Sequence, residues 1–115
     1  MRKIEIPALI AAAALPLLVT SCSREKATDA VDLRAQGGTV YKNVCIACHN
    51  ADPSLPGSLG PAVAGASREL IEARVIRGTY PEGYTAKQAG GVMPQFPHLE
   101  GSIDALASYL ATPTE

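Results

Sequence analysis

The chain has 115 residues, 47% of them hydrophobic, which is enough for one small domain and a targeting segment but not for several domains. Ten Lys and Arg against eleven Asp and Glu give a formal net charge of −1 without any basic cluster. This balance argues against a nucleic-acid partner.

The chain begins with a segment that has the features of a secretory signal. Arg2 and Lys3 precede an apolar run from Ile4 to Val19, which two prolines interrupt. The run is shorter than the roughly 18 residues or more of a membrane-spanning helix, and small residues follow it. We therefore expect residues 1–21 to be a signal peptide that is removed. The alternative is an uncleaved membrane anchor.

The end of this segment resembles the bacterial lipobox, in which an aliphatic residue and two small residues precede a cysteine. The pattern is matched by Val19, Thr20, Ser21 and Cys22. The resemblance implies that Cys22 is lipidated and holds the protein on a membrane at the periplasmic side of a bacterial cell envelope. The serine after Cys22 favours the outer membrane, by resemblance to lipoprotein sorting signals.

Residues 22–35 are polar and charged, and we interpret them as a lipid-anchored tether that leads into a domain at residues 36–115. That domain is small and poor in aromatic residues, since the whole chain has no Trp and one Phe. A core of this size is marginal without an added staple such as a disulfide, a metal or a cofactor.

The first helix of the domain is expected to begin near Asp29 or Asp32 and to run into Val44. Gly37 and Gly38 would then lie inside it, although a helical glycine costs about 1 kcal/mol relative to alanine. A close packing partner would explain at least one of them. The alternative is a helix that begins only after the glycines.

Two thiols two residues apart, followed at once by a histidine, come directly after this helix in Cys45-Ile46-Ala47-Cys48-His49. This spacing is typical of c-type haem attachment, because the two sulfurs can reach two vinyl groups on one edge of the macrocycle. We expect Cys45 and Cys48 to form thioethers with one haem c and His49 to be the proximal iron ligand. The haem would also supply the apolar mass that the small core lacks.

Three other interpretations of this motif compete. A redox Cys-x-x-Cys normally accompanies a βαβ pattern, and the sequence contains no runs typical of strands. A zinc site needs four ligands, and only Cys22 and His98 would be left to complete one. The match could also be accidental. With two cysteines assigned to haem and Cys22 to lipid, no disulfide is expected.

Beyond the motif, residues 50–61 are rich in glycine and proline and predict a loop. A second helix is expected from Ser67 as N-cap to Arg77, with Gly78 as C-cap. Its buried residues would be Leu70, Ile71, Val75 and Ile76, and its solvated face would carry Arg68, Arg74 and Arg77.

Residues 79–97 form another extended glycine- and proline-rich segment, and loops of this length are usually functional. The last helix is expected to begin at Ser102 as N-cap and to stop before Pro113. Its apolar positions are Ile103, Leu106, Ala107 and Leu110.

The sixth iron ligand would come from the only methionine or the only other histidine left after signal removal, Met93 or His98. Met93 is favoured, because Pro94 biases it towards an extended conformation that suits a segment lying against a flat macrocycle. Its thioether is also a soft ligand for iron. Met93 could instead fill a gap in the core, and His98 is the second candidate ligand.

Beyond these motifs, the stretch from Gly37 to Leu110 resembles the class I cytochrome c family. The family's glycine and aromatic residue before the first cysteine are matched by Gly37, Val40 and Tyr41, and the pair on its terminal helix by Leu106, Tyr109 and Leu110. The resemblance implies that the first and last helices cross at these residues.

Gly60-Pro61 resembles the family's Gly-Pro loop, which implies that the Pro61 carbonyl accepts a hydrogen bond from the His49 ring and so belongs to the cofactor site. Met93-Pro94 resembles its distal ligand and following proline. The stretch from Thr79 to Gly91 departs from the family pattern. This stretch contains three polar side chains, those of Tyr80, Tyr84 and Lys87. They could bind a haem propionate, or they could be ordinary loop residues.

The resemblance implies an all-α cytochrome c fold, with three main helices and long loops wrapped around one covalent haem. We expect a single-electron carrier with His/Met ligation and not an enzyme, in a respiratory or periplasmic electron-transfer chain. Its partners would be a redox donor and acceptor, which dock at the edge near Cys45, Ala47 and Cys48. The alternatives are a haem peroxidase or gas sensor with a displaceable sixth ligand, and a fixed electron-transfer subunit of a larger oxidoreductase.

Overall fold

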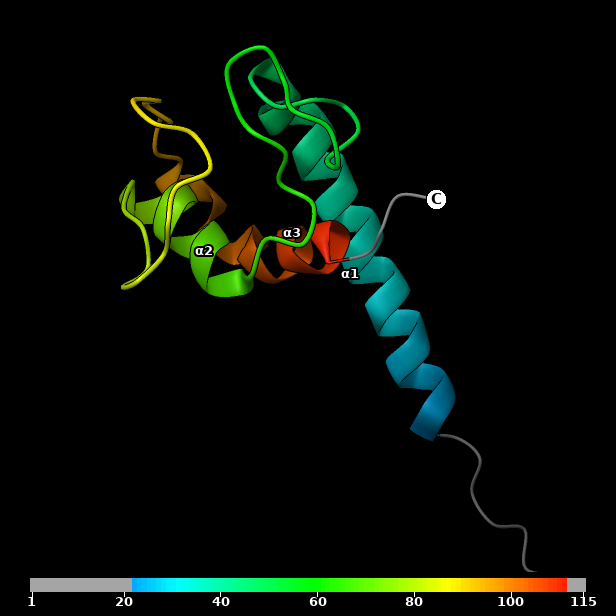
Figure 1. Ribbon diagram of the computed structural model, residues 1–115. Helices are drawn as coiled ribbons and strands as arrows, with labels where there is room; N and C mark the ends of the chain where they lie inside the picture. The colour runs from blue at the N-terminus through cyan, green and yellow to red at the C-terminus, as the bar shows by residue number, and fades with distance from the viewer. Residues whose placement is uncertain (1–21, 112–115) are drawn as a thin grey trace, which may run out of the picture.

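The computed structural model describes residues 22–111, with backbone alone for 22–26, and their regular structure is entirely helical (Figure 1). The three α-helices are α1 (Cys22–Val44), α2 (Arg68–Glu72) and α3 (Ile103–Leu110). Two 3₁₀ segments, η1 (Cys45–Ala47) and η3 (Pro97–Ser102), and one π-helical turn, η2 (Ala73–Arg77), complete them. The expected all-α class is confirmed for this part of the chain. The predicted signal peptide and the lipidated side chain of Cys22 lie outside the described residues.

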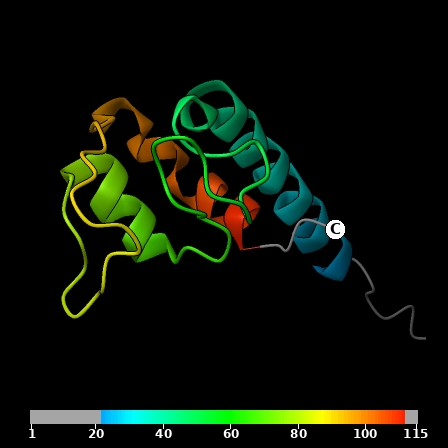
Figure 2. The same cartoon turned by 45° about the horizontal axis from the view of Figure 1, so that its top comes forward.

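α1 and α3 cross at close range (Figure 2). The residues of α1 at this crossing include Gly37 and Gly38, which have no side chain. A Cβ atom on Gly37 would overlap the backbone carbonyl of Ala105. Gly38 faces the ring of Tyr109, which also contacts Tyr41 at 5.4 Å between ring centroids. Close packing therefore explains both glycines, and the alternative of a helix that begins after them is wrong.

α1 is longer than the sequence pattern predicted. It begins at Cys22, not near Asp29 or Asp32, so the stretch interpreted as a tether is itself helical. Residues 22–36 contain no glycine or proline and are rich in Ala, Glu, Lys, Arg and Leu, which favour helix without any packing partner. Residues 27–36 are all exposed, and this half of α1 projects beyond the rest of the fold (Figure 1). No helix within residues 22–111 is long and apolar enough to cross a bilayer.

The hydrophobic core lies where α1, α3 and the α2–η2 helix meet. Its most deeply buried side chains come from α1 and α3, and each is 1% exposed: Tyr41, Ile103 and Leu106. Ile71, Val75, Leu99 and Leu110 complete the cluster. Leu70 and Ile76, expected to be buried, are half-buried.

The second helical segment has the predicted ends but not a uniform interior. The Ser67 hydroxyl accepts a hydrogen bond from the Leu70 amide at 3.2 Å, and Gly78 ends the segment in the left-handed conformation, with φ of 65°. Between them, the α-helix changes at Ala73 into a π-turn, whose hydrogen bonds span one residue more. Arg68 bridges Glu72 and Asp104, and so links α2 to α3 on the surface.

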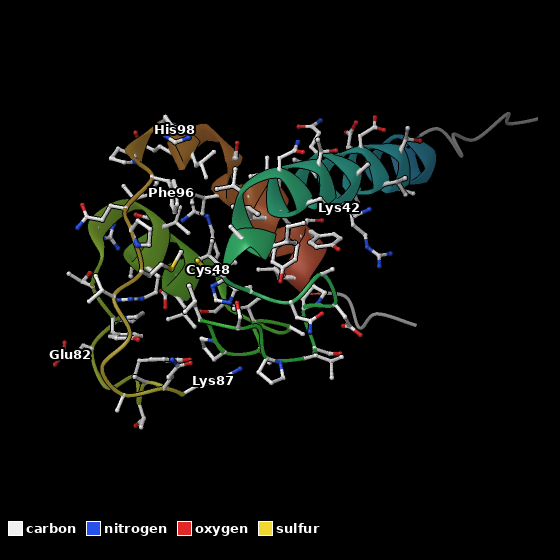
Figure 3. All side chains as sticks on the ribbon, turned by 90° about the horizontal axis from the view of Figure 1, so that it is seen from above. Lys42, Cys48, Glu82, Lys87, Phe96 and His98 are labelled. Atoms are coloured by element: carbon white, nitrogen blue, oxygen red, sulfur yellow. The ribbon has the colours of Figure 1, made fainter. Side chains whose placement is uncertain are left out.

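Two long loops without helix or strand, residues 50–66 and 79–96, connect these elements as predicted. The loops approach each other on the side of the molecule away from α1 (Figure 3). Ser102 immediately precedes α3, also as predicted, although its side chain makes no capping hydrogen bond.

Candidate cofactor site

A mainly apolar cavity of about 390 Å³ lies between the Cys-x-x-Cys-His motif and the two loops. Its volume is within the range of sites that hold small molecules and cofactors. All five residues that the sequence predicted for cofactor binding line it: Cys45, Cys48, His49, Pro61 and Met93. The fold therefore brings together residues from the end of α1 and from both loops.

His49 is oriented by the first loop. Its Nδ1 atom lies 2.8 Å from the carbonyl oxygen of Pro61, as the Gly-Pro resemblance implied. A neutral imidazole that donates from Nδ1 presents an unprotonated Nε2, which is the form that ligates a metal. The arrangement thus fixes both the tautomer and the direction of the ring.

The first loop can approach His49 this closely because two of its residues lack side chains. A Cβ atom on Gly60 would lie 2.6 Å from Nδ1 of His49, and one on Gly57 would overlap the backbone of Cys48 and His49. The amides of Leu59 and Gly60 both donate to the Cys48 carbonyl, at 3.2 and 3.0 Å. In the sequence, Gly57 is only one residue of the glycine- and proline-rich stretch 50–61, and its contact with the motif is not visible there.

The surroundings of the motif disfavour charge. Burial, and then proximity to Cys48, raises the pKa of the Cys45 thiol to about 11. A redox-active Cys-x-x-Cys has a depressed thiol pKa, so Cys45 has the opposite character. Burial also raises the pKa of Tyr41 to about 12, and its hydroxyl donates to the Asn50 carbonyl at 2.7 Å. Both groups are neutral at physiological pH.

Of the two candidate sixth ligands, Met93 lies at the cavity and His98 does not. Met93 is half-buried, lines the cavity and also packs against the core. The chain just after it is held to η2, where the Phe96 amide donates to the Val75 carbonyl at 2.7 Å. His98 is exposed on η3, and in Figure 3 it lies at the outer edge of the molecule, away from Cys48.

The charged side chains among the described lining of the cavity are cationic. Arg74 and Lys87 line it, and its described lining contains no Asp or Glu. The Arg74 guanidinium lies 4.2 Å above the centre of the Tyr80 ring, which stacks on Tyr84 at 5.5 Å, and both rings also line the cavity. Arg74 was expected on the solvated face, and this expectation is wrong. Its position three residues after Ile71 was a signal that it shares the buried face.

The arrangement offers a mainly apolar enclosure lined by two thiols, an imidazole, a methionine and two cationic side chains. Within residues 22–111, no three side chains of His, Cys, Asp or Glu gather as a metal-ion cluster. Comparisons of the chain with models of protein families, with curated proteins and with solved structures found no match in any of the three.

Proposed function

We propose that this cavity holds one haem c, joined to Cys45 and Cys48 by thioether bonds and ligated by His49 and Met93, and that the protein carries single electrons between redox partners. One observation carries the proposal. The Cys-x-x-Cys-His motif, with its oriented imidazole, and Met93 from the second loop lie far apart in the chain, yet they line the same mainly apolar cavity.

The character of the cavity wall fits this cofactor. Haem has a large apolar body and two carboxylates on one edge, and the wall is mainly apolar apart from the cations and phenols of residues 74–87. Burial of a carboxylate is costly unless a cation or hydrogen-bond donors face it. Arg74 and the hydroxyls of Tyr80 and Tyr84 are the groups that would meet the propionates, whereas the Lys87 ammonium donates to the Ala62 carbonyl.

The residues of the chain would divide the remaining tasks. Bound haem supplies a reversible one-electron couple. Pro61 holds the His49 ring in place, and a Met93 thioether paired with histidine raises the reduction potential relative to two imidazoles. His49 and Met93 would together hold the iron and leave no position for a substrate, which would suit a carrier better than a catalyst.

The crossing of α1 and α3 at Gly37 supports a class I cytochrome c fold, in which the helices and the two loops surround the haem. Ile46 and Ala47, between the two cysteines of the motif, are exposed, and Leu59, 68% exposed, lines the cavity. This small apolar edge would be the docking surface for transient redox partners. The exposed half of α1 would stand between a lipidated Cys22 and the haem domain, as an arm from the membrane of a bacterial cell envelope.

The experiment is to export the full chain in a bacterium that attaches c-type haem, and to measure the mass and optical spectrum of the product. We expect one covalent haem and a sulfur-to-iron charge-transfer band in the ferric protein. Met93→Ala should abolish that band, whereas the control His98→Ala should retain it.

A product without tetrapyrrole would refute the proposal. Rapid carbon monoxide binding to the untreated ferrous protein would show an open sixth position, and would favour a sensor or a peroxidase instead. An unchanged spectrum in Met93→Ala would exclude Met93 as the ligand.

A further inference from the structure

The segment of residues 79–92, here called the strap, leads from the end of η2 to Met93 and is fastened to the opposite wall of the cavity. The Lys87 ammonium donates to the Ala62 carbonyl at 3.0 Å, and the Gln88 side-chain amide donates to the Leu59 carbonyl at 3.2 Å. In Figure 3 Lys87 lies at the edge where the two loops meet.

These two bonds link the loop that orients His49 to the loop that carries Met93. Leu59 and Ala62 flank Gly60-Pro61, the pair against which the His49 ring rests. On the other side, Lys87 and Gln88 come a few residues before Met93 in the same loop. Met93 therefore lies between the strap's two bonds and the Phe96 amide bond to η2.

The half of the strap that precedes Met93 is exposed to solvent. Residues 85–92 are all exposed, and Val92 is 95% exposed. Gly83 and Gly90, one on each side of the two donors, adopt positive φ of 76° and 75° with open space around them. A segment with few buried apolar contacts opens at low free-energy cost, so its closed position depends on its hydrogen bonds.

We infer that Lys87 and Gln88 are positioning residues, which keep the strap closed and so hold Met93 in place and restrict access of small molecules to the sixth iron position. The inference rests on the proposed haem site. A hydrogen bond of this kind typically changes an equilibrium roughly three- to tenfold. Each residue should therefore reduce the open population of the strap by about that factor.

The test measures the rate at which imidazole replaces the native ligand in the ferric haem protein, at concentrations where strap opening limits the rate. Lys87→Met and Gln88→Leu should each accelerate binding roughly three- to tenfold, and the double variant by about the product of the two factors. Lys87→Arg keeps a donor and should restore a rate near that of the unaltered protein. Lys42→Met and Gln36→Leu, on the exposed face of α1, are matched controls that should leave the rate unchanged.

Amide hydrogen exchange provides a second readout that does not depend on iron ligation. Both variants should exchange faster within residues 79–92, and at an unchanged rate in α3. Unchanged imidazole rates and unchanged exchange in both variants, with haem and the charge-transfer band intact, would overturn the inference.

Acceleration by Lys87→Met alone, together with a shifted reduction potential, would also overturn it, because this result would assign Lys87 to a haem carboxylate and not to the strap. Gln88 is uncharged, so it separates these two outcomes. If the unaltered protein carried no haem, the proposed function would fail instead, and the two failures are thus distinguishable.

Discussion

Replacing Gly37 by alanine tests whether the crossing of the two terminal helices limits the stability of the fold. The added methyl group favours α1 by about 1 kcal/mol through helix propensity. However, it would overlap the backbone carbonyl of Ala105, which can retreat only if α3 moves as a whole. Overpacking of this kind costs about 1–3 kcal/mol and more when backbone must shift, so we expect a net destabilisation of about 2 kcal/mol.

Gly38→Ala is the matched control in the same helix. Its Cβ would lie 3.1 Å from the edge of the Tyr109 ring, a side chain that can turn aside. We expect this variant to change stability by less than about 1 kcal/mol, since the propensity gain offsets the contact. Urea denaturation of the exported protein, followed by circular dichroism, would measure both variants. If Gly37→Ala were as stable as Gly38→Ala, the packing explanation for Gly37 would be wrong.

Three further predictions concern the site. Gly60→Ala should sharply lower the yield of haem-loaded protein, because its methyl group would press on the His49 ring. Gly101→Ala, with open space around it, should leave the yield unchanged. Haem absorbance per unit of protein measures both variants. The contribution of Tyr41 to the free energy of unfolding should be fully present below about pH 10 and should be lost, by up to about 3 kcal/mol, as the pH rises towards 12. Burial raises the Tyr41 pKa to about 12 in the folded state, so only the unfolded state ionises readily in that range. Tyr41→Phe should lack this fall in a pH series of urea titrations. Arg74→Gln should lower the reduction potential by on the order of tens of millivolts, since loss of a nearby cation favours the ferric state. Arg34→Gln, at an exposed position, is the control. A redox titration that showed no difference between the two variants would place Arg74 away from the haem.

The sequence predicted the elements whose signals are local. Ser67 and Gly78 marked the ends of the second helical segment because their roles depend only on their neighbours in the chain. The start of α1 was wrong for the complementary reason. Residues 27–36 of this helix are exposed, so no apolar pattern marks them and only the weak preference of each residue for helix indicated their structure.

Residues of the candidate site could be predicted from the sequence where they belong to a short motif with characteristic spacing. Contacts between residues that lie far apart in the chain could not be predicted. Cys45, Cys48 and His49 follow from one short motif. The sequence shows that residue 57 is a glycine, but it does not show that a Cβ atom there would overlap the backbone of Cys48 and His49. Arg74 was assigned by its charge and not by its place on the helix. The partners of Lys87 and Gln88 lie 25 and 29 residues away, and no local rule pairs them.

The meeting of α1 with α3 also has a consequence for the order of events during biogenesis. The two helices come from opposite ends of the described chain, so the core cannot close until the last-synthesised helix has arrived. In the folded protein Cys45 packs against the core to which α3 contributes, and its burial raises the pKa of the thiol. If haem is attached as proposed, the sulfurs would be easiest to reach before α3 docks, and docking would then enclose the product.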